Sequence, residues 1–433
     1  MTQDLTPRTP TASMSIDMDF PSLWIGTAEY AEGPTGATVF YFPGKAIGAV
    51  DVRGGAPGAY NVDWLKLGYD FPDIDAIAIA GGSWYGLAAS AGVAGELKRS
   101  GRKSGDWRNL ANVAGAIVYD LGDRRLNEIH PDERLGAAAL AAARAGRFPL
   151  GARGAGRMVM QGSYFGLWLH SGQGGAFRQI GRTKIASFAV VNAVGAIVDR
   201  RGQIVSGGQP LGVAETSIDA LLRLVPDQLC TVPGSIMGQR TVAPANPANT
   251  TISVVVTNQR LAYSALQRLA VQVHASMGRA IQPFATANDG DVLFAVSTAE
   301  VDDTNLQATD LGTVASELMW DAILASFPDL SAPQVAQGSV PVPAARAGNY
   351  AFAPGVSVTV GAQGKRMMIT NRSGRPIFGI APSESITSTI DVDGSFSAPG
   401  PFLLGGRFET TPSSGRPVLV LNPGPWEQRA PRD

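Results

Sequence analysis

A run of β-branched residues at 252–257 lies near the middle of this 433-residue chain, and strands alternate with helices on both sides of it. Branched and aromatic residues favour strands, which we predict at 38–42, 77–80, 116–119, 252–257 and 292–296, and as a pair around a Gly turn at 185–198 and 204–205. Helical spacing or small-residue stretches predict helices at 87–97, 131–145, 214–224, 266–277 and 313–326. This alternation predicts layers of helices that cover stacked sheets.

The composition is that of a compact protein without an electrostatic footprint for nucleic acid or an anionic membrane. Hydrophobic residues make up 45% of the chain, charged residues 16%, and the formal net charge is −1. No uninterrupted apolar stretch is long enough to predict a membrane span. Residues 1–19 lack the pattern of a secretory signal. We therefore expect a cytoplasmic protein with no nucleic-acid or membrane partner.

Few residues are available for thiol or imidazole chemistry. Cys230 is the single cysteine, which excludes an intrachain disulfide and a zinc site built on several thiolates. The three histidines are His130, His170 and His274, and His274 lies beside the apolar face of its predicted helix, as a partly buried structural histidine would. We predict neither a metal nor a cofactor.

Asn249 and Thr250 stand where a loop rich in Pro, Ala and Asn meets the β-branched strand. We predict that residues 232–249 form an exposed connector, in which backbone cleavage is geometrically possible. A cut before Thr250 would give its hydroxyl a neighbouring α-amine, whose reference pKa of ~7.7–8.0 suits a general base. A plain strand that begins with a threonine pair explains the same residues without chemistry.

Four further residues offer groups that could support such a nucleophile. Asp289 and Asp291 flank Gly290 just before an apolar strand, where they could orient a hydroxyl and an amine or simply form a turn. Asn192 follows an apolar run, and its amide could donate to an oxyanion or belong to an ordinary turn. Tyr119 ends its predicted strand and could be a second donor or a core phenol.

Eight segments in one order, from about Trp24 to Phe327, resemble a family of self-cleaving aminopeptidases. The family is related to D-aminopeptidase and the β-aminopeptidases, and the resemblance is closest to the endo-acting nylon-oligomer hydrolases, which hydrolyse 6-aminohexanoate oligomers. The segments are residues 32–38, 117–120, 172–178, 249–253, 272–274, 281–284, 289–291 and 316–321.

The resemblance implies an α/β (α+β) fold, a four-layer αββα sandwich of the N-terminal-nucleophile-like type, cleaved autocatalytically between Asn249 and Thr250. The α chain would be residues 1–249 and the β chain would begin at 250, with masses of ~26 and ~19 kDa. An oligomer of cleaved α/β heterodimers is also implied. The domain division that we expect is an N-terminal extension at 1–23, the autoprocessed domain at 24–330, a linker at 331–348, and a small all-β appendage at 349–433 that lies outside the resemblance.

By position in the family's motifs, Thr250 would be the nucleophile, Asp289 and Asp291 its carboxylate partners, and Asn192 and Tyr119 its hydrogen-bonding supports. The substrate implied is a small amide or peptide.

One family feature is missing, because the nylon-oligomer hydrolases carry a lysine where this chain reads Gly162-Ser163. Either Ser163 replaces the lysine's role, another group such as Lys184 supplies the charge, or cleavage and turnover are weakened. Tyr164, Phe165 and Trp168 could line an apolar substrate channel or pack in the core.

Two other functions fit the same residues. One is an aminopeptidase for short peptides with D- or β-amino acids at the amino end. The other is an inactive binding or assembly protein that keeps the fold, an alternative motivated by the missing lysine.

Overall fold

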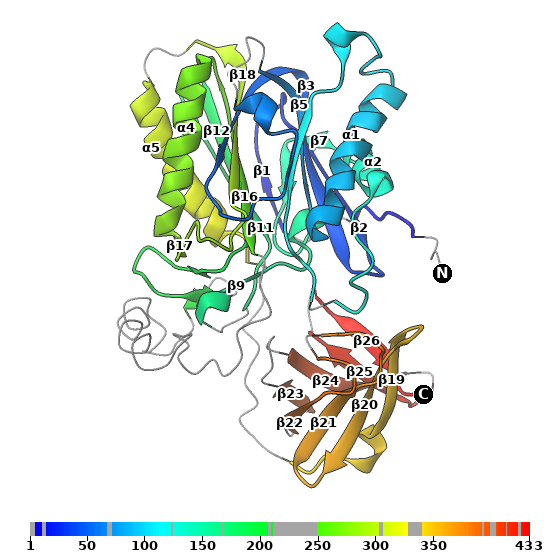
Figure 1. Ribbon diagram of the computed structural model, residues 1–433. Helices are drawn as coiled ribbons and strands as arrows, with labels where there is room; N and C mark the ends of the chain where they lie inside the picture. Colours follow the sequence, from blue (N-terminus) through cyan, green and yellow to red (C-terminus); the bar gives the residue numbers. More distant parts are fainter. Residues whose placement is uncertain are drawn as a thin grey trace.

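A computed structural model describes most of the chain (Figure 1). The described residues are 5–10, 14–66, 72–122, 124–165, 169–206, 209–210, 249–302, 306–327, 340–378, 380–391, 394–398, 404–412, 414–422 and 426–433. The helix predicted at 214–224 and nearly all of the connector predicted at 232–249 lie outside these residues. Within the described ranges, no helix is both long and apolar enough to cross a membrane.

A ten-stranded mixed sheet forms the frame of the molecule, in the order β11-β12-β16-β18-β3-β5-β6-β4, with β2 pairing with β3 and β7 with β2. Its strands are β2 (Trp24–Tyr30), β3 (Thr35–Val52), β4 (Ala59–Tyr60), β5 (Asp73–Ala80), β6 (Val113–Ile117), β7 (Arg144–Ala145), β11 (Gln173–Ile180), β12 (Thr183–Asn192), β16 (Thr250–Gln259) and β18 (Val292–Val301). The first half of β3 pairs with β2 and β5, and its second half pairs with β18. One long strand therefore belongs to both halves of the sheet.

The two halves of this sheet face each other across a hydrophobic core. Alternate residues of β16 point inward, for example Ile252 and Val254, and they share this core with Phe40, Ile77 and Ile79 from the other half. Residues two apart on a strand point to the same face, so the intervening residues must be covered from outside.

Two pairs of helices provide that cover. Val255 and Leu293 pack in a second core with α4 (Tyr263–Ser276) and α5 (Ala308–Leu324). Ala76 and Ala78 pack in a third core with α1 (Ala88–Arg99) and α2 (Glu133–Ala141). Figure 1 shows the two helix pairs on opposite sides of the strands. Three cores between four layers confirm the predicted αββα sandwich.

One local difference from the prediction is the end of α2. The alanine-rich segment predicts a helix from 131 to 145, but α2 begins at Glu133, after the Asp132 side chain caps the Leu135 N–H, and it ends at Ala141. Residues Arg144–Ala145 instead form β7, which pairs with β2. Hydrogen bonding at a free sheet edge thus outweighs the helix propensity of alanine here.

Short strand pairs lie between and beside these layers. They are β1 (Ser15–Asp17) with β8 (Arg147–Pro149), β9 (Met160–Gln161) with β10 (Leu169–His170), β13 (Ala196–Ile197) with β17 (Ile281–Gln282), and β14 (Val205–Ser206) with β15 (Gln209–Pro210). The β9–β10 pair contacts the end of β12, where the Met160 N–H donates to Asn192.

Residues 348–433, which we name the C-terminal β-module, form an eight-stranded antiparallel sheet in sequence order. Its strands are β19 (Gly348–Ala353), β20 (Val356–Gln363), β21 (Arg366–Asn371), β22 (Ser385–Ile390), β23 (Ser395–Ala398), β24 (Leu404–Thr410), β25 (Pro417–Leu421) and β26 (Gln428–Pro431). A bridge between Tyr350 and Arg432 brings the last strand beside the first. Alternate residues of β20, such as Val356 and Val358, point into its core.

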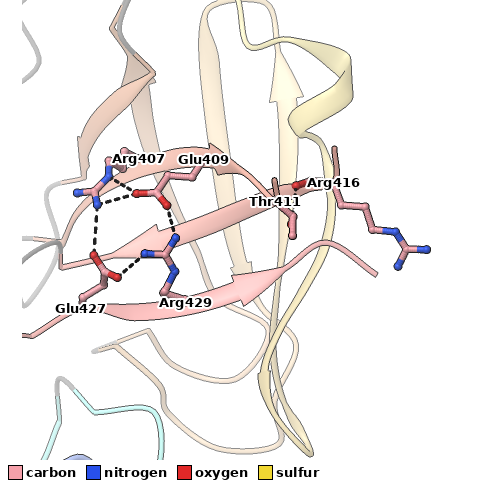
Figure 2. A network of polar contacts seen from close by, with 6 residues as sticks. All are labelled: Arg407, Glu409, Thr411, Arg416, Glu427 and Arg429. Carbon is pink, nitrogen blue, oxygen red and sulfur yellow. Dashed lines mark hydrogen bonds and ion pairs between the residues drawn. The ribbon is translucent and has the colours of Figure 1, made fainter. Parts of the chain in front are cut away.

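The outer face of the C-terminal β-module carries a ring of charged side chains (Figure 2). Arg407 contacts Glu409 at 2.7 Å and Glu427 at 3.3 Å, and Arg429 contacts both Glu427 and Glu409. Hydrogen bonds from Arg407 and Arg429 hold the pKa of Glu409 below its usual range. Gln428, between Glu427 and Arg429, is buried on the opposite face of the strand. One strand therefore presents charges to solvent and an amide to the interior.

Candidate active site

Thr250 is the first residue of β16, and the strands on both sides fix its position. Asn192 at the end of β12 is its register partner, and Asn249 forms a parallel bridge with Asp289 just before β18. Thr250, Asn192, Asn249 and Asp289 are all buried. The predicted site residues that lie far apart in sequence thus meet where these strands begin and end.

The peptide group that precedes Thr250 has the contacts that cleavage would use. The Thr250 hydroxyl donates to the Asn249 carbonyl oxygen at 2.5 Å, and the Gly290 backbone N–H donates to the same oxygen at 2.8 Å. A tetrahedral intermediate would place negative charge on that oxygen, and the Gly290 N–H is already placed to stabilise it. Sequence reasoning identified Asp289 and Asp291 but missed the amide between them.

The two aspartates hold the backbone around Thr250 instead of its hydroxyl. Asp291 accepts hydrogen bonds from the Thr251 N–H at 2.6 Å and the Ala285 N–H at 3.1 Å. Asp289 accepts hydrogen bonds from the Val194 N–H at 3.2 Å and from the Thr286 hydroxyl at 2.9 Å. Neither carboxylate contacts the Thr250 hydroxyl within the described residues, so in the uncut chain they position the segments on either side of it.

Burial changes the acidity of both carboxyl groups. It raises the pKa of Asp291 well above its usual range, and the nearby charge of Asp289 adds to that rise. Burial also raises the pKa of Asp289, against the hydrogen bonds from Thr286 and Val194, which lower it. Two carboxyl groups this close and this dry share protons more readily than exposed ones. Raised pKa values of this kind are common at catalytic sites.

The side-chain amide of Asn192 is held from both ends. Its Oδ1 accepts from the Met160 N–H at 3.0 Å, and its Nδ2 donates to the Tyr119 carbonyl oxygen at 2.9 Å. An amide nitrogen carries two hydrogens, so one remains for an oxyanion. Tyr119 therefore supports Asn192 through its backbone. A donor role for its hydroxyl, whose pKa is raised by burial, stays a prediction.

Ser163 lies at the site and Lys184 does not. The Ser163 hydroxyl accepts from the Asn249 side-chain amide at 2.7 Å, so it contacts the residue that precedes the predicted cleavage position. Lys184 pairs with Asp19 at 2.8 Å near the opposite end of β12. Eight residues of strand separate Lys184 from Asn192, or about 26 Å. The alternative in which Lys184 supplies charge to the site is therefore wrong.

Of the proposed apolar channel, Trp168 and the side chain of Phe165 lie outside the described residues. The half-buried Tyr164 donates its N–H to the Val194 carbonyl oxygen, beside Ser163. His274 is fully buried, and its Nδ1 lies 2.9 Å from Asp51, as expected of a structural histidine. In the described ranges, no three His, Cys, Asp or Glu side chains come together as a metal site would require.

The αββα fold thus holds a buried threonine hydroxyl on the carbonyl oxygen of the preceding residue, an arrangement compatible with an amide hydrolase or aminopeptidase. The sequence model of peptidase family S58 matches residues 18–337. The chain therefore belongs to peptidase family S58 and is a hydrolase.

Curated relatives and a solved structure agree with this assignment. The chain is 41% identical over 336 residues to the 6-aminohexanoate-oligomer endohydrolases of Kocuria sp. (strain KY2) and Paenarthrobacter ureafaciens, which covers 74% of this chain and 88% of each relative. It is 34% identical to an uncharacterized aminopeptidase of Mycobacterium bovis, over 61% of this chain and 74% of that protein. The structure of a Burkholderia sp. beta-aminopeptidase has the same fold, with a TM-score of 0.51 at 16% identity, over 73% of this chain and 88% of that one.

Proposed function

We propose that the chain cuts itself between Asn249 and Thr250 and then uses Thr250 as an N-terminal nucleophile to hydrolyse linear amides such as 6-aminohexanoate oligomers. The observation that carries this proposal is the hydrogen bond from the Thr250 hydroxyl to the Asn249 carbonyl, with the Gly290 N–H on the same oxygen. This arrangement brings a nucleophile and an oxyanion donor to one peptide bond.

In the first stage the Thr250 oxygen attacks the Asn249 carbonyl carbon, and charge on the carbonyl oxygen is met by the Gly290 N–H. The carbon–nitrogen bond breaks, the hydroxyl proton passes to the departing nitrogen, and an ester joins Asn249 to Thr250. Water then hydrolyses the ester, which releases the Asn249 carboxylate and restores the Thr250 hydroxyl. The hydrogen bond from the Asn249 side-chain amide to the Ser163 hydroxyl keeps Asn249, which carries the carbonyl group, in position during the attack.

In the second stage the freed α-amine of Thr250 accepts the proton of its own hydroxyl as that oxygen attacks a substrate amide. The remaining hydrogen of the Asn192 amide stabilises the oxyanion. The protonated α-amine gives its proton to the leaving amine, and water hydrolyses the acyl-enzyme. Asp291 keeps the start of β16 in place through the Thr251 N–H.

The substrate class is supported by the relatives. Relatives named for 6-aminohexanoate oligomers are 41% identical to this chain, whereas those named aminopeptidases are 33–34% identical. An internal amide between methylene chains is thus favoured over the first amide of a peptide.

Thr250→Ala, Thr250→Ser and wild-type protein test the first stage on a denaturing gel. We expect fragments of ~26 and ~19 kDa from wild type and from Thr250→Ser, and a single uncut band from Thr250→Ala. Thr257→Ala is the matched control, because it changes a buried threonine at the far end of the same strand. Amino-terminal sequencing of the smaller fragment must begin at Thr250.

Substrate profiling tests the second stage. A linear 6-aminohexanoate tetramer and a β-alanine anilide are offered to the cleaved protein, and product lengths are read by mass spectrometry. Internal cleavage of the tetramer supports an endohydrolase, and release of aniline alone supports the aminopeptidase alternative. Equal background hydrolysis by wild type and Thr250→Ala would leave only the inactive binding protein.

A further inference from the structure

The C-terminal β-module lies outside the family match, which ends at residue 337, yet it contacts the part of the chain that holds the active site. In Figure 1, β26 lies on the side of the module that faces the four layers. Arg375 of the module pairs with Glu128 of the layered part. Two further contacts bear on the site and come from Trp426, just before β26, and from Gln428, its first residue.

The first contact is made by Trp426. Its ring stacks on the His170 ring with centroids 4.2 Å apart and an angle of 14° between the planes. Trp426 is only 8% exposed and also packs with Ala152 and Met158. His170 is the register partner of Met160 in the β9–β10 pair. Trp426 therefore packs on the hairpin whose Met160 N–H binds the Asn192 Oδ1.

The second contact is made by Gln428. Its Oε1 accepts from the Arg125 N–H at 3.1 Å, and the adjacent Leu126 is buried in the core of the module. Gln428 itself is 1% exposed. This contact fixes the end of the segment that begins with Tyr119, whose carbonyl oxygen receives the Asn192 Nδ2.

A buried ion pair stiffens the segment between those two points. The Arg124 guanidinium lies 3.6 Å from Asp120, and both side chains are fully buried. Asp120 in turn accepts from the Thr35 hydroxyl at 2.6 Å and the Gly82 N–H at 2.7 Å. The segment from Asp120 to Arg124 is therefore held by buried contacts, and Gln428 holds its far end at Arg125.

We propose that the C-terminal β-module is a positioning element of the active site, which acts through Trp426 and Gln428 on the two segments that orient the Asn192 amide. The terminal torsion of asparagine is broad, so an amide held at one end still rotates. Contacts at Oδ1 and at Nδ2 together set its angle, and the module supports both. The inference rests on the proposed role of Asn192 as oxyanion donor.

The test compares full-length Trp426→Ala, Trp426→Phe and His170→Ala with wild type, using the linear 6-aminohexanoate tetramer. We expect kcat to fall about 10-fold in Trp426→Ala with KM changed less than about 3-fold, since a poorly aimed oxyanion donor affects the transition state more than binding. Trp426→Phe should retain most of kcat because it keeps a ring on His170. A double variant with Trp426→Ala and His170→Ala should have nearly the same kcat as Trp426→Ala alone, because both changes remove the same ring contact.

Arg429→Gln is the matched control, because it breaks the charged ring on the outer face of the same strand and leaves the inner contacts intact (Figure 2). Hydrogen exchange of the Met160 amide gives a second readout that needs no turnover, and exchange should be faster in Trp426→Ala than in Arg429→Gln. A folded Trp426→Ala protein with wild-type kcat and wild-type Met160 protection overturns the inference. Wild-type protein without hydrolysis overturns the proposed function instead, and the exchange experiment still decides the coupling.

Discussion

Gly290 offers the sharpest test of the proposed cut between Asn249 and Thr250. A Cβ at this position would lie 2.6 Å from the Thr250 hydroxyl oxygen and 2.8 Å from the backbone oxygen of Ala56 on another side. Ordinary contact begins near 3.4 Å, so the hydroxyl would have to move by about 0.8 Å. The Ala56 backbone prevents the new methyl group from moving away instead.

A displacement of this size removes the hydroxyl from the Asn249 carbonyl. Misplacing a reacting group by about 1 Å costs on the order of 10²-fold in rate, which corresponds to ~2.7 kcal/mol in the barrier. We therefore expect Gly290→Ala to cut itself about 100-fold more slowly than wild type.

A time course on a denaturing gel measures the loss of the full-length band after synthesis in a cell-free system. Gly278→Ala is the matched control, since the nearest atom to its Cβ would be 4.0 Å away, and it should cut at the wild-type rate. If Gly290→Ala is folded and cuts as fast as wild type, the reasoning from the Thr250 geometry is refuted.

Three further predictions concern the neighbouring polar groups. Because the fold raises the pKa of Asp291 above its unfolded value of about 3.9, its contribution to stability is complete below that value and is lost as pH rises through the folded pKa. In an uncut Thr250→Ala background, denaturant unfolding should thus show stability falling more with pH than when Asp291→Asn is added, and parallel curves would contradict this. Ser163→Ala removes the acceptor of the buried Asn249 amide, so the free energy of unfolding should fall by about 1–3 kcal/mol and the cut should slow; an unchanged rate and midpoint would count against the role of Ser163. Lys184→Ala should leave the cutting rate on the same gel within about 2-fold of wild type, because this lysine pairs with Asp19 far from the site, and a large loss would restore it as a candidate.

Much of the fold could be predicted because its signals are local. The β-branched run at 252–257 lies inside β16, and the apolar run at 292–296 lies inside β18. Alternation of strands and helices then leaves few ways to bury every apolar face. The end of α2 was mispredicted because Arg144 and Ala145 pair with Ile25 and Trp24 of a sheet edge far away in sequence, and this pairing competes with local helix propensity.

The site was predictable in its residue types and less so in its contacts. The spacing of Asp289 and Asp291 indicates carboxylates near a strand, but only the bridge from Asn249 to Asp289 aims the Gly290 N–H at the carbonyl. Lys184 and Asn192 share one strand, and sequence gives no sign that their ends serve different parts of the molecule. The Trp426–His170 stack joins residues with no local pattern in common.

The order of the central strands decides what a cut chain can do next. β16 and β18 would belong to the fragment that begins at Thr250, whereas β12 and β3 would belong to the other fragment. In the sheet, β16 pairs with β12 and β18 pairs with β3. Neither fragment could dissociate without breaking the β12–β16 and β18–β3 pairings and exposing the hydrophobic core that both fragments share. Cleavage of this one peptide bond would therefore give two fragments that stay associated and migrate as a single species in the absence of denaturant. The new carboxyl end at Asn249 and the new amino end at Thr250 would remain close together.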